Sequence, residues 1–475
     1  MAQGHIMPFL ALALEIEQKK GYTITFINTP QNIKKLRSSL PPNSTIRLLE
    51  IPFCSSDHGL PPNTENTDTL PFHLMLRFLE SSSSLKPSFR ALISNLFAEK
   101  QGHPPLCIVA DMFFAWSAEV AHEFGVFHAI FNATGGYGMA VYHTLWLNLP
   151  HEKTNADEFL LPDFPEESRI HVKELPEHLR IAKSTDSWTV FQQKLFHEWL
   201  NADGFLFNTV EELDHVGLLY FRRKIRRPVW PIGPIVLSMG SQARAGKEVG
   251  ITWEFCNKWL DTKPSNSVLY ISFGSQSTLS ASQMMQLAMA LEASGKFFVW
   301  VVRPPLEFDV NFDFEVEKWL PKGFKQRMTE QKQGLLVQNW APQWEILSHK
   351  SVSAFLSHCG WNSVLEALTN GVPIMAWPMG AEQDFNAKML EEEMGVCVGV
   401  ARGNGCEVRH EDIVKKIELV MSGTEKGEDM RRKACDVREV SKKAMKDEEG
   451  FKGSSVKAMD EFLNSALLIR EKTRL

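Results

Sequence analysis

The chain has 475 residues, of which 44% are hydrophobic and 23% charged, and its formal net charge is −6. This length predicts at least two domains, and the composition is typical of a globular protein. The mild negative charge gives no electrostatic case for nucleic acid or an anionic membrane as a partner. The seven cysteines include no C-x-x-C pair, which argues against a disulfide framework and a zinc site.

The hydropathy pattern indicates the cellular location to expect. No run reaches the roughly 18 apolar residues that a membrane-spanning helix needs. Gln3, Gly4 and His5 also interrupt the basic-then-apolar layout of a signal peptide. We therefore expect a cytoplasmic protein with no membrane insertion.

The first half of the chain alternates helical and strand-like segments. Residues 8–20 have a helical apolar face, with Pro8 suited to the first turn and Gly21 just past the end. Residues 23–27 then predict a strand, and residues 106–110 predict another that is buried on both faces. This alternation indicates a parallel sheet covered by helices.

The alternation stops and then resumes after the middle of the chain. Residues 227–250 are rich in Pro, Gly and Ser, which is typical of an interdomain linker. A helix is predicted near residues 280–294. Five strands are predicted at residues 267–272, 297–302, 335–338, 352–357 and 373–377. The pattern indicates an α/β protein of two doubly wound domains with a cleft between them.

Residues 340–383 contain the strongest functional signal. Gly360 allows a sharp turn from the strand at 352–357 into a helix that begins near Trp361. The amides of Asn362 and Ser363 would then lie at a helix N-terminus, where the dipole and free N–H groups bind an anion such as phosphate.

The surrounding side chains suit a nucleotide sugar. His358 precedes the turn and could donate to the same anion, while Glu366 lies one turn further along the helix, where it could bind a ribose diol. Trp340 follows a strand and offers a flat face to a nucleobase. Glu382 and Gln383 together supply acceptors and donors for a polyhydroxyl ligand. A structural role is commoner for each residue alone, but the set favours a binding site.

The block resembles the signature box of plant secondary-product glycosyltransferases, which use uridine diphosphate sugars. It matches that box without gaps, including W-A-P-Q, H-C-G-W-N-S and the terminal E-Q. The resemblance implies an α/β GT-B fold of two Rossmann-like domains with a cleft between them. It also implies an inverting mechanism that needs no metal. We expect the UDP-sugar to be a co-substrate, no other cofactor to be required and the enzyme to be a monomer.

The resemblance assigns donor-site roles residue by residue. Trp340 would stack on uracil, and Ala341 would meet the uracil edge through its backbone. The ribose hydroxyls would bind Gln343 and Glu366. The remaining contacts would be Ser275, His358, Asn362 and Ser363 for the diphosphate, and Trp361, Glu382 and Gln383 for the sugar. Gln383 is the residue that glucose-using members usually carry, so UDP-glucose is the expected donor.

The acceptor hydroxyl must lose a proton as it attacks the anomeric carbon, and histidine suits that task near neutral pH. His5, in Gly4-His5-Ile6-Met7-Pro8, is expected in a loop directly before the first helix. It matches the family's catalytic base. Asp111 follows the strand at 106–110 and matches the partner aspartate that orients the imidazole. Hydrophobic residues just after Asp111 could line an acceptor pocket or belong to the core.

These assignments divide the chain into four predicted segments. Residues 1–235 are expected to form the acceptor-binding domain, and residues 236–255 the linker. Residues 256–455 are expected to form the UDP-sugar-binding domain. A C-terminal helix at 456–475 is expected to pack back on the first domain.

Three questions stay open at this stage. The acceptor is expected to be a small, lipophilic, hydroxylated plant metabolite, and flavonoids, phenylpropanoids, terpenoids and hormones are all compatible, at any hydroxyl position. The sugar could be another hexose. The alternatives to an active enzyme are a non-catalytic nucleotide-sugar-binding protein and an inactive truncated form. A nicotinamide-dependent oxidoreductase is disfavoured because the dinucleotide-binding glycine spacing is missing.

The segment before His5 leads to a separate hypothesis. Relatives place a buried strand there, and the four residues 1–4 are fewer than the five to six of a typical strand. We therefore expect that Met1 is an internal methionine and that the natural protein has an N-terminal extension carrying this strand.

Overall fold

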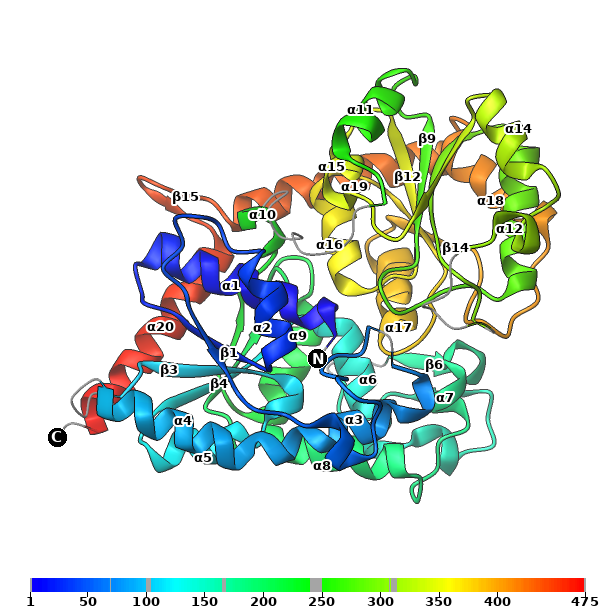
Figure 1. Cartoon of the computed structure of the whole chain (residues 1–475). Coiled ribbons are helices and arrows are strands. Elements are labelled where there is room, and N and C mark those ends of the chain that lie inside the picture. The colour runs from blue at the N-terminus through cyan, green and yellow to red at the C-terminus, as the bar shows by residue number, and fades with distance from the viewer. Residues whose placement is uncertain are drawn as a thin grey trace. The chain divides into compact units, whose positions relative to one another are not determined.

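The chain folds into two compact units, one formed by Met1–Gly246 with Lys443–Leu475 and the other by Lys247–Lys442 (Figure 1). The computed structural model describes residues 2–68, 70–99, 104–164, 168–239, 250–306, 308 and 314–473. Residues 240–249 of the predicted linker lie outside this range. The chain returns to the first unit at Lys443, whereas the boundary predicted from the sequence is residue 456. Within the described ranges, no helix is both long and apolar enough to cross a membrane.

The first unit contains a parallel sheet in the order β3-β4-β7-β8 and a separate parallel pair of β1 with β2. The described residues of this unit also form two short antiparallel pairs, β5 with β6 and β15 with β16. The strands are β1 (Thr25–Asn28), β2 (Arg47–Glu50), β3 (Cys107–Asp111), β4 (Phe127–Asn132), β5 (Glu158–Leu160), β6 (Arg169–His171), β7 (Gly204–Phe207), β8 (Val229–Pro231), β15 (Asp447–Glu448) and β16 (Phe451–Lys452).

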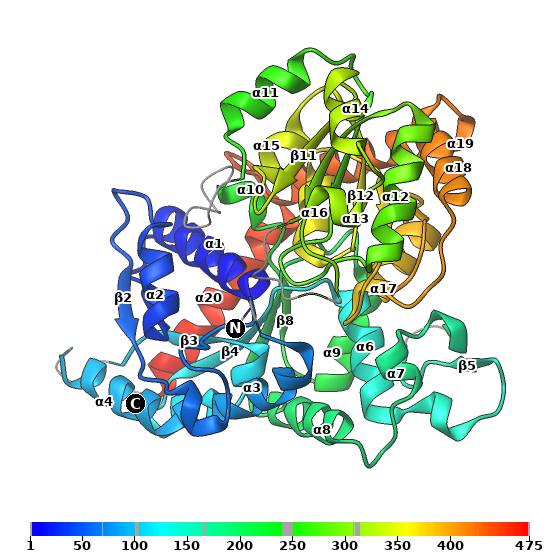
Figure 2. The ribbon, with the colours of Figure 1, turned by 45° about the vertical axis from the view of Figure 1, so that its right-hand side comes forward.

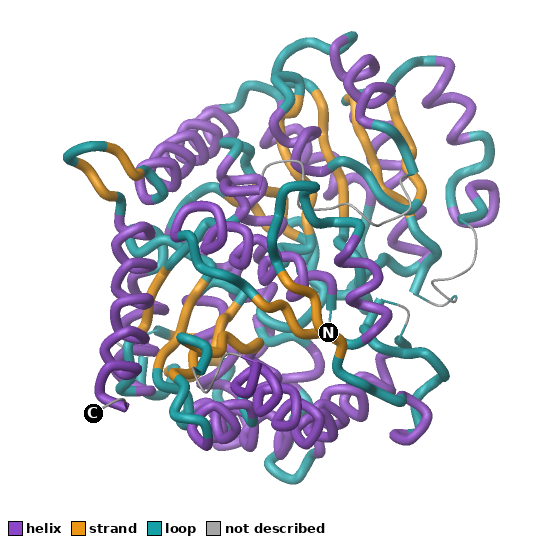
Figure 3. The backbone as a smooth tube through the Cα atoms, turned by 60° about the vertical axis from the view of Figure 1, so that its left-hand side comes forward, coloured by secondary structure: helices purple, strands orange, loops and turns teal. Residues whose placement is uncertain are grey.

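Helices cover these strands. They are α1 (Gln3–Lys20), α2 (Pro30–Arg37), α3 (Met75–Ser81), α4 (Lys86–Glu99), α5 (Ser117–Glu123), α6 (Gly136–Asn148), α7 (Glu177–Arg180), α8 (Ser187–Trp199), α9 (His215–Ile225), α10 (Val236–Met239) and α20 (Ser454–Thr473). Figure 3 shows α20, which ends at the C-terminus, lying beside the strands of the first unit. Phe462 of α20 is fully buried and contacts the rings of Phe127 and Trp230.

The start of α1 corrects one expectation. The helix begins at Gln3, so His5 lies in its first turn and not in a loop before it. Pro8, interpreted from sequence as a first-turn residue, lies inside the helix. Proline lacks an N–H group and therefore removes one backbone hydrogen bond there. The turn before it still forms, because the carbonyl of Ala2 accepts hydrogen bonds from the amides of His5 and Ile6 and because Ile6 is buried.

The second unit is a six-stranded parallel sheet in the order β11-β10-β9-β12-β13-β14. Its strands are β9 (Val268–Ser272), β10 (Phe297–Val302), β11 (Gly334–Gln338), β12 (Val352–Ser357), β13 (Ile374–Ala376) and β14 (Cys397–Gly399). Their apolar runs are buried on both faces, as a parallel sheet between helices requires. All five strands predicted in this half are confirmed to within one residue at each end.

The helices of the second unit divide between the two faces of its sheet. They are α11 (Trp253–Asp261), α12 (Ala281–Ser294), α13 (Val316–Trp319), α14 (Phe324–Glu330), α15 (Gln343–Ser348), α16 (Trp361–Thr369), α17 (Gln383–Lys388), α18 (His410–Met421) and α19 (Glu425–Ala444), with one π-helical turn at Met389–Glu393. In Figures 1 and 2, α12 and α18 lie on one side of the sheet and α15 and α16 on the other. Residues of α12 and α18 share one apolar core with alternate residues of β9, β10 and β12.

Candidate active site

The residues predicted to act chemically fall into two groups, one in each unit. In the first unit, Nδ1 of His5 lies 2.7 Å from Oδ2 of Asp111. Asp111 is the last residue of β3 and is 1% exposed, whereas the His5 side chain is 21% exposed. The other carboxylate oxygen, Oδ1, accepts a hydrogen bond from the amide of Phe113. The structure therefore brings the predicted base and its predicted partner together.

This geometry limits the chemistry of the imidazole. Because Nδ1 donates its hydrogen to the buried carboxylate, Nε2 is the ring nitrogen that carries the lone pair. An aspartate in this position also stabilises the imidazolium that forms after proton uptake. Of the hydrophobic residues after Asp111, Phe113 lies with its ring centroid 5.6 Å from that of His5, while Trp116 belongs to a core cluster with Phe89.

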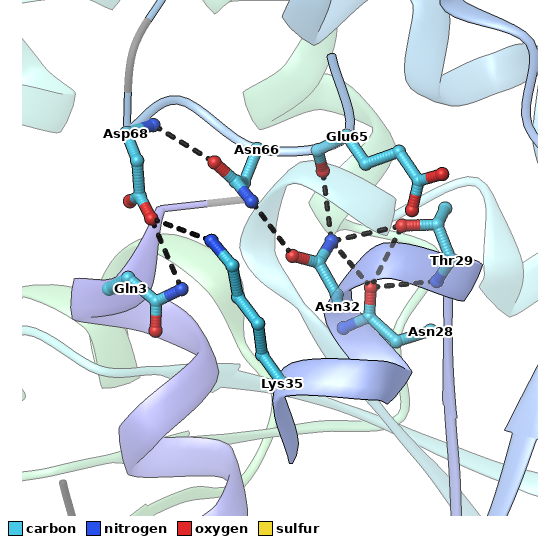
Figure 4. A network of polar contacts seen from close by, with 8 residues as sticks. All are labelled: Gln3, Asn28, Thr29, Asn32, Lys35, Glu65, Asn66 and Asp68. Atoms are coloured by element: carbon cyan, nitrogen blue, oxygen red, sulfur yellow. Dashed lines mark hydrogen bonds and ion pairs between the residues drawn. The ribbon is translucent and has the colours of Figure 1, made fainter. Parts of the chain in front are cut away.

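A polar network supports the first turn of α1 (Figure 4). Nε2 of Gln3, two residues before His5, donates to Asp68, which also pairs with Lys35 of α2. The amide of Asp68 donates to Asn66. The network continues from Asn66 through Asn32 to Asn28 and Thr29 at the end of β1. The segment that carries His5 is thus connected by side-chain hydrogen bonds to α2 and to the end of β1.

In the second unit, the turn from β12 into α16 forms as predicted, but with a different role for its glycine. The left-handed residue is Cys359, with φ of 61°, while Gly360 has φ of −61° and is the N-cap of α16. A Cβ atom at Gly360 would lie 2.4 Å from Nε2 of His358. Glycine is required here because the imidazole packs against the backbone and not because of the backbone angles.

His358 is enclosed from a second side by Gly274, which follows β9 with φ of 77°. A Cβ atom there would lie 2.6 Å from Nε2 of the same imidazole. Burial lowers the pKa of His358 to about 4, the positive charge of Arg303 adds to this, and a hydrogen bond to the backbone of Ser272 opposes it. Nδ1 has no hydrogen-bond partner within the described part of the chain. The turn therefore holds a neutral imidazole whose buried Nδ1 is left unpartnered by the described residues.

The residues predicted to bind ribose are in contact with one another. Nε2 of Gln343 donates to Glu366 at 2.6 Å and to Oγ of Ser363 at 3.1 Å. All three side chains are buried. Ala341, predicted to contact the uracil edge, is also buried, and the carbonyl of Trp340 accepts a hydrogen bond from Gly250.

The remaining predicted donor residues lie in the segments that follow three strands, β9, β12 and β13. Trp361 is buried, and Asn362 and Ser275 are half-buried. Oε1 of Gln383 accepts hydrogen bonds from the amides of Met379 and Gly380. Its Nε2 group is consequently the end of the amide that can contact a ligand, and it can act only as a donor. Glu382, the N-cap residue of α17, supplies a neighbouring acceptor.

Asp384 follows Gln383, is almost fully buried and is not among the residues predicted from the sequence. Burial raises the pKa of Asp384 to about 6, and the charge of Arg402, 3.6 Å away, opposes this only in part. No sequence signal distinguishes Asp384 from a solvated carboxylate in the first turn of a helix, because its burial follows from tertiary packing.

We expect Asp384→Asn to stabilise the protein at about pH 7.5. The unfolded chain ionises this carboxyl above its ordinary pKa of 3.8, whereas the folded protein keeps it protonated up to about pH 6. The contribution of Asp384 to stability is therefore present below about pH 4 and is lost as the pH rises to about 6. The difference corresponds to about 3 kcal/mol, or roughly 6–12 °C in Tm for a unit of this size.

Thermal unfolding of both proteins between about pH 4 and pH 8 measures this effect. The gain in Tm should vanish at the acidic end. Asp412→Asn is the matched control, because Lys415 lowers the pKa of this exposed aspartate and its replacement should give no gain at any pH. A gain for Asp384→Asn that does not change with pH would contradict the explanation.

Comparisons with known proteins identify the family. Residues 252–432 match the family model described as UDP-glucoronosyl and UDP-glucosyl transferase. UDP-glycosyltransferase 92A1 of Arabidopsis thaliana is 48% identical over 476 residues, which cover 98% of this chain and 96% of that protein. The chain belongs to the plant UDP-glycosyltransferase family. Crocetin glucosyltransferase 3 of Crocus sativus is 42% identical to this glycosyltransferase over 445 residues, 92% of each chain.

Solved structures of relatives confirm the GT-B fold of this glycosyltransferase. UGT73P12 of Glycyrrhiza uralensis, complexed with glycyrrhetinic acid 3-O-monoglucuronide, has a TM-score of 0.83 and 29% identity, covering 100% of this chain and 95% of the other. UGT2 of Phytolacca americana, complexed with UDP-2fluoro-glucose and pterostilbene, has a TM-score of 0.77 and 27% identity, covering 98% and 97%. The predicted family, fold class and enzyme class are therefore confirmed.

Proposed function

We propose that this enzyme transfers glucose from UDP-glucose to a hydroxyl group of a small lipophilic plant metabolite with inversion at the anomeric carbon. The observation that carries the proposal is the 2.7 Å contact between His5 and the buried carboxylate of Asp111. A non-catalytic binding protein has no need of a histidine paired in this way. Family membership supports the donor class.

In the proposed step, Nε2 of His5 accepts the proton of the acceptor hydroxyl as its oxygen forms a bond to the anomeric carbon. The bond from that carbon to the diphosphate oxygen breaks on the opposite face, and UDP leaves with the electron pair. Asp111 keeps the imidazole in the required tautomer and stabilises its positive charge. One displacement of this kind converts an α-linked donor into a β-linked product.

The donor roles are proposed as the resemblance assigns them, and the contacts in the second unit support them. The amides at the start of α16, with Ser275, Asn362 and Ser363, would bind the diphosphate. A neutral His358 would add a hydrogen bond to it without a full charge. Glu382 would accept from sugar hydroxyls and Nε2 of Gln383 would donate to them. Stacking on Trp340 would hold the uracil.

The acceptor class rests on chemistry and on the range of relatives. Phe113 beside His5 offers an apolar ring to a flat or lipophilic molecule. One relative, 32% identical, is a UDP-glucose flavonoid 3-O-glucosyltransferase of Fragaria ananassa, so flavonoids are among the proposed acceptors. We also propose that the enzyme acts as a cytoplasmic monomer and requires neither a metal nor another cofactor.

A donor-by-acceptor screen tests the function. UDP-glucose, UDP-galactose and UDP-glucuronic acid would each be offered with flavonoids, phenylpropanoids and terpenoids, and glycosides detected by mass spectrometry. We expect glucosides with the β configuration by NMR and the highest kcat/KM with UDP-glucose. Binding of UDP-glucose without turnover on any acceptor would contradict a catalytic role, and an α-linked product would contradict the inverting displacement.

A further inference from the structure

A buried tyrosine continues the hydrogen-bond chain of the ribose residues into the sheet of the second unit. The hydroxyl of Tyr270, on β9, lies 3.2 Å from Oε1 of Gln343 and donates to it. Nε2 of Gln343 in turn donates to Glu366 at 2.6 Å. Tyr270 is 1% exposed, and Gln343 and Glu366, the next two members of the hydrogen-bond chain, are also buried. Three elements, β9, α15 and α16, are thus linked by consecutive side chains.

The amide of Gln343 is held at both of its ends. Its oxygen accepts from the tyrosine hydroxyl and its NH2 group donates to the carboxylate and to Ser363. The reverse orientation would turn the amide oxygen toward the negative charge of Glu366, which is unfavourable. The carboxylate therefore selects the orientation, and the tyrosine hydroxyl prevents the amide from swinging away from it.

The position of the hydroxyl is itself fixed by the sheet. Tyr270 is paired in register with Phe355 of the neighbouring strand β12. Their rings stack with centroids 4.9 Å apart and an interplanar angle of 29°. Stacked rings on two hydrogen-bonded strands leave the tyrosine little freedom. The hydroxyl is a fixed point against which Gln343, and through it Glu366, is placed.

We propose that Tyr270 is a positioning residue for the donor ribose. It acts through Gln343 to hold the carboxylate of Glu366 where the ribose diol binds, and the inference rests on the proposed role of Gln343 and Glu366 as ribose contacts. A sequence interpretation treats a tyrosine inside a buried strand as core. The packing of the sheet requires its aromatic ring but not its hydroxyl group.

The test is Tyr270→Phe, which keeps the ring and the stack on Phe355 and removes one oxygen. We expect KM for UDP-glucose to rise by about three- to tenfold, as loss of one buried hydrogen bond allows. We expect kcat and KM for the acceptor to change by less than about twofold, because neither depends on the ribose contact.

The decisive readout is donor discrimination. The wild-type enzyme should prefer UDP-glucose to its analogue that lacks the ribose 2′-hydroxyl, and Tyr270→Phe should reduce this preference by about the factor by which KM rises. Tyr220→Phe is the matched control, since Tyr220 is also fully buried and its hydroxyl bonds to His143 in the first unit. The control should lower stability and leave the donor preference unchanged.

The outcomes distinguish a failure of the positioning role of Tyr270 from a failure of the proposed ribose site. If Tyr270→Phe retains the full wild-type preference, or raises KM equally for both donors, the positioning role is overturned and the ribose assignment stands. If the wild-type enzyme turns over both donors equally, there is no 2′-hydroxyl contact to position. That result would overturn the role of Tyr270 together with the proposed ribose role of Glu366 and Gln343.

Discussion

Replacing His5 by alanine is expected to lower kcat by about 10²- to 10⁴-fold, the usual contribution of a general base. The substitution removes the ring nitrogen proposed to accept the proton and leaves the second unit untouched, so KM for UDP-glucose should stay within about twofold. Asp111→Asn should act in the same direction, because an amide cannot stabilise the imidazolium as a carboxylate does. Steady-state kinetics with the best acceptor from the screen would measure both effects.

A second histidine–aspartate pair provides the control. Nε2 of His122 lies 3.1 Å from Asp203 on the surface of the same unit. His122→Ala removes a comparable pair and should leave kcat unchanged. If His5→Ala also retains wild-type kcat while the protein stays folded, His5 is not the base.

Gly274→Ala is expected to raise KM for UDP-glucose by at least about tenfold, because two unfavourable effects coincide at this position. The residue is left-handed, which an alanine adopts only with strain. The added Cβ would also meet the His358 ring at 2.6 Å, so the imidazole or the turn that carries Ser275 must move. Both are proposed diphosphate contacts, and KM for the acceptor should change far less.

Gly295→Ala separates these two effects. Gly295 has φ of 62° at the end of α12 in the same unit, and an added Cβ would meet nothing within 4 Å. This control should lower stability by about 1 kcal/mol through strain alone and leave KM for UDP-glucose unchanged. Equal effects of the two substitutions on KM would show that the contact with His358 is irrelevant to donor binding.

Regular elements of the second unit can be predicted from sequence because local signals agree there with tertiary structure. Strand β10 is an unbroken apolar run, and α12 has Ser280 and Gln283 in a reciprocal capping box. The start of α1 is predicted wrongly, because Pro8 is locally compatible with a first turn. Only the burial of Ile6 and the bonds to the carbonyl of Ala2 favour the earlier start.

The residues of the candidate site also divide into those with a local sequence signal and those defined by tertiary contacts. Trp340, Glu366 and Gln383 can be predicted from sequence as candidate site residues because they belong to one continuous block with a family pattern. Tyr270 and Asp384 are not predicted, because their contacts are with residues more than ten positions away in the chain, such as Gln343 and Arg402. Gly360 is predicted correctly as part of the turn, but its predicted role in the backbone conformation is wrong. The contact that requires a glycine there is with a side chain whose orientation the sequence does not define.

The discontinuity of the first unit has a consequence for synthesis. Residues up to Gly246 leave the ribosome before any of the second unit, yet the core around Phe127 and Trp230 includes Phe462 of α20. The second unit, continuous from Lys247 to Lys442, can complete its own core as it emerges. The half of the protein made first is thus finished last, and until then it exposes apolar surface of the kind that chaperones recognise.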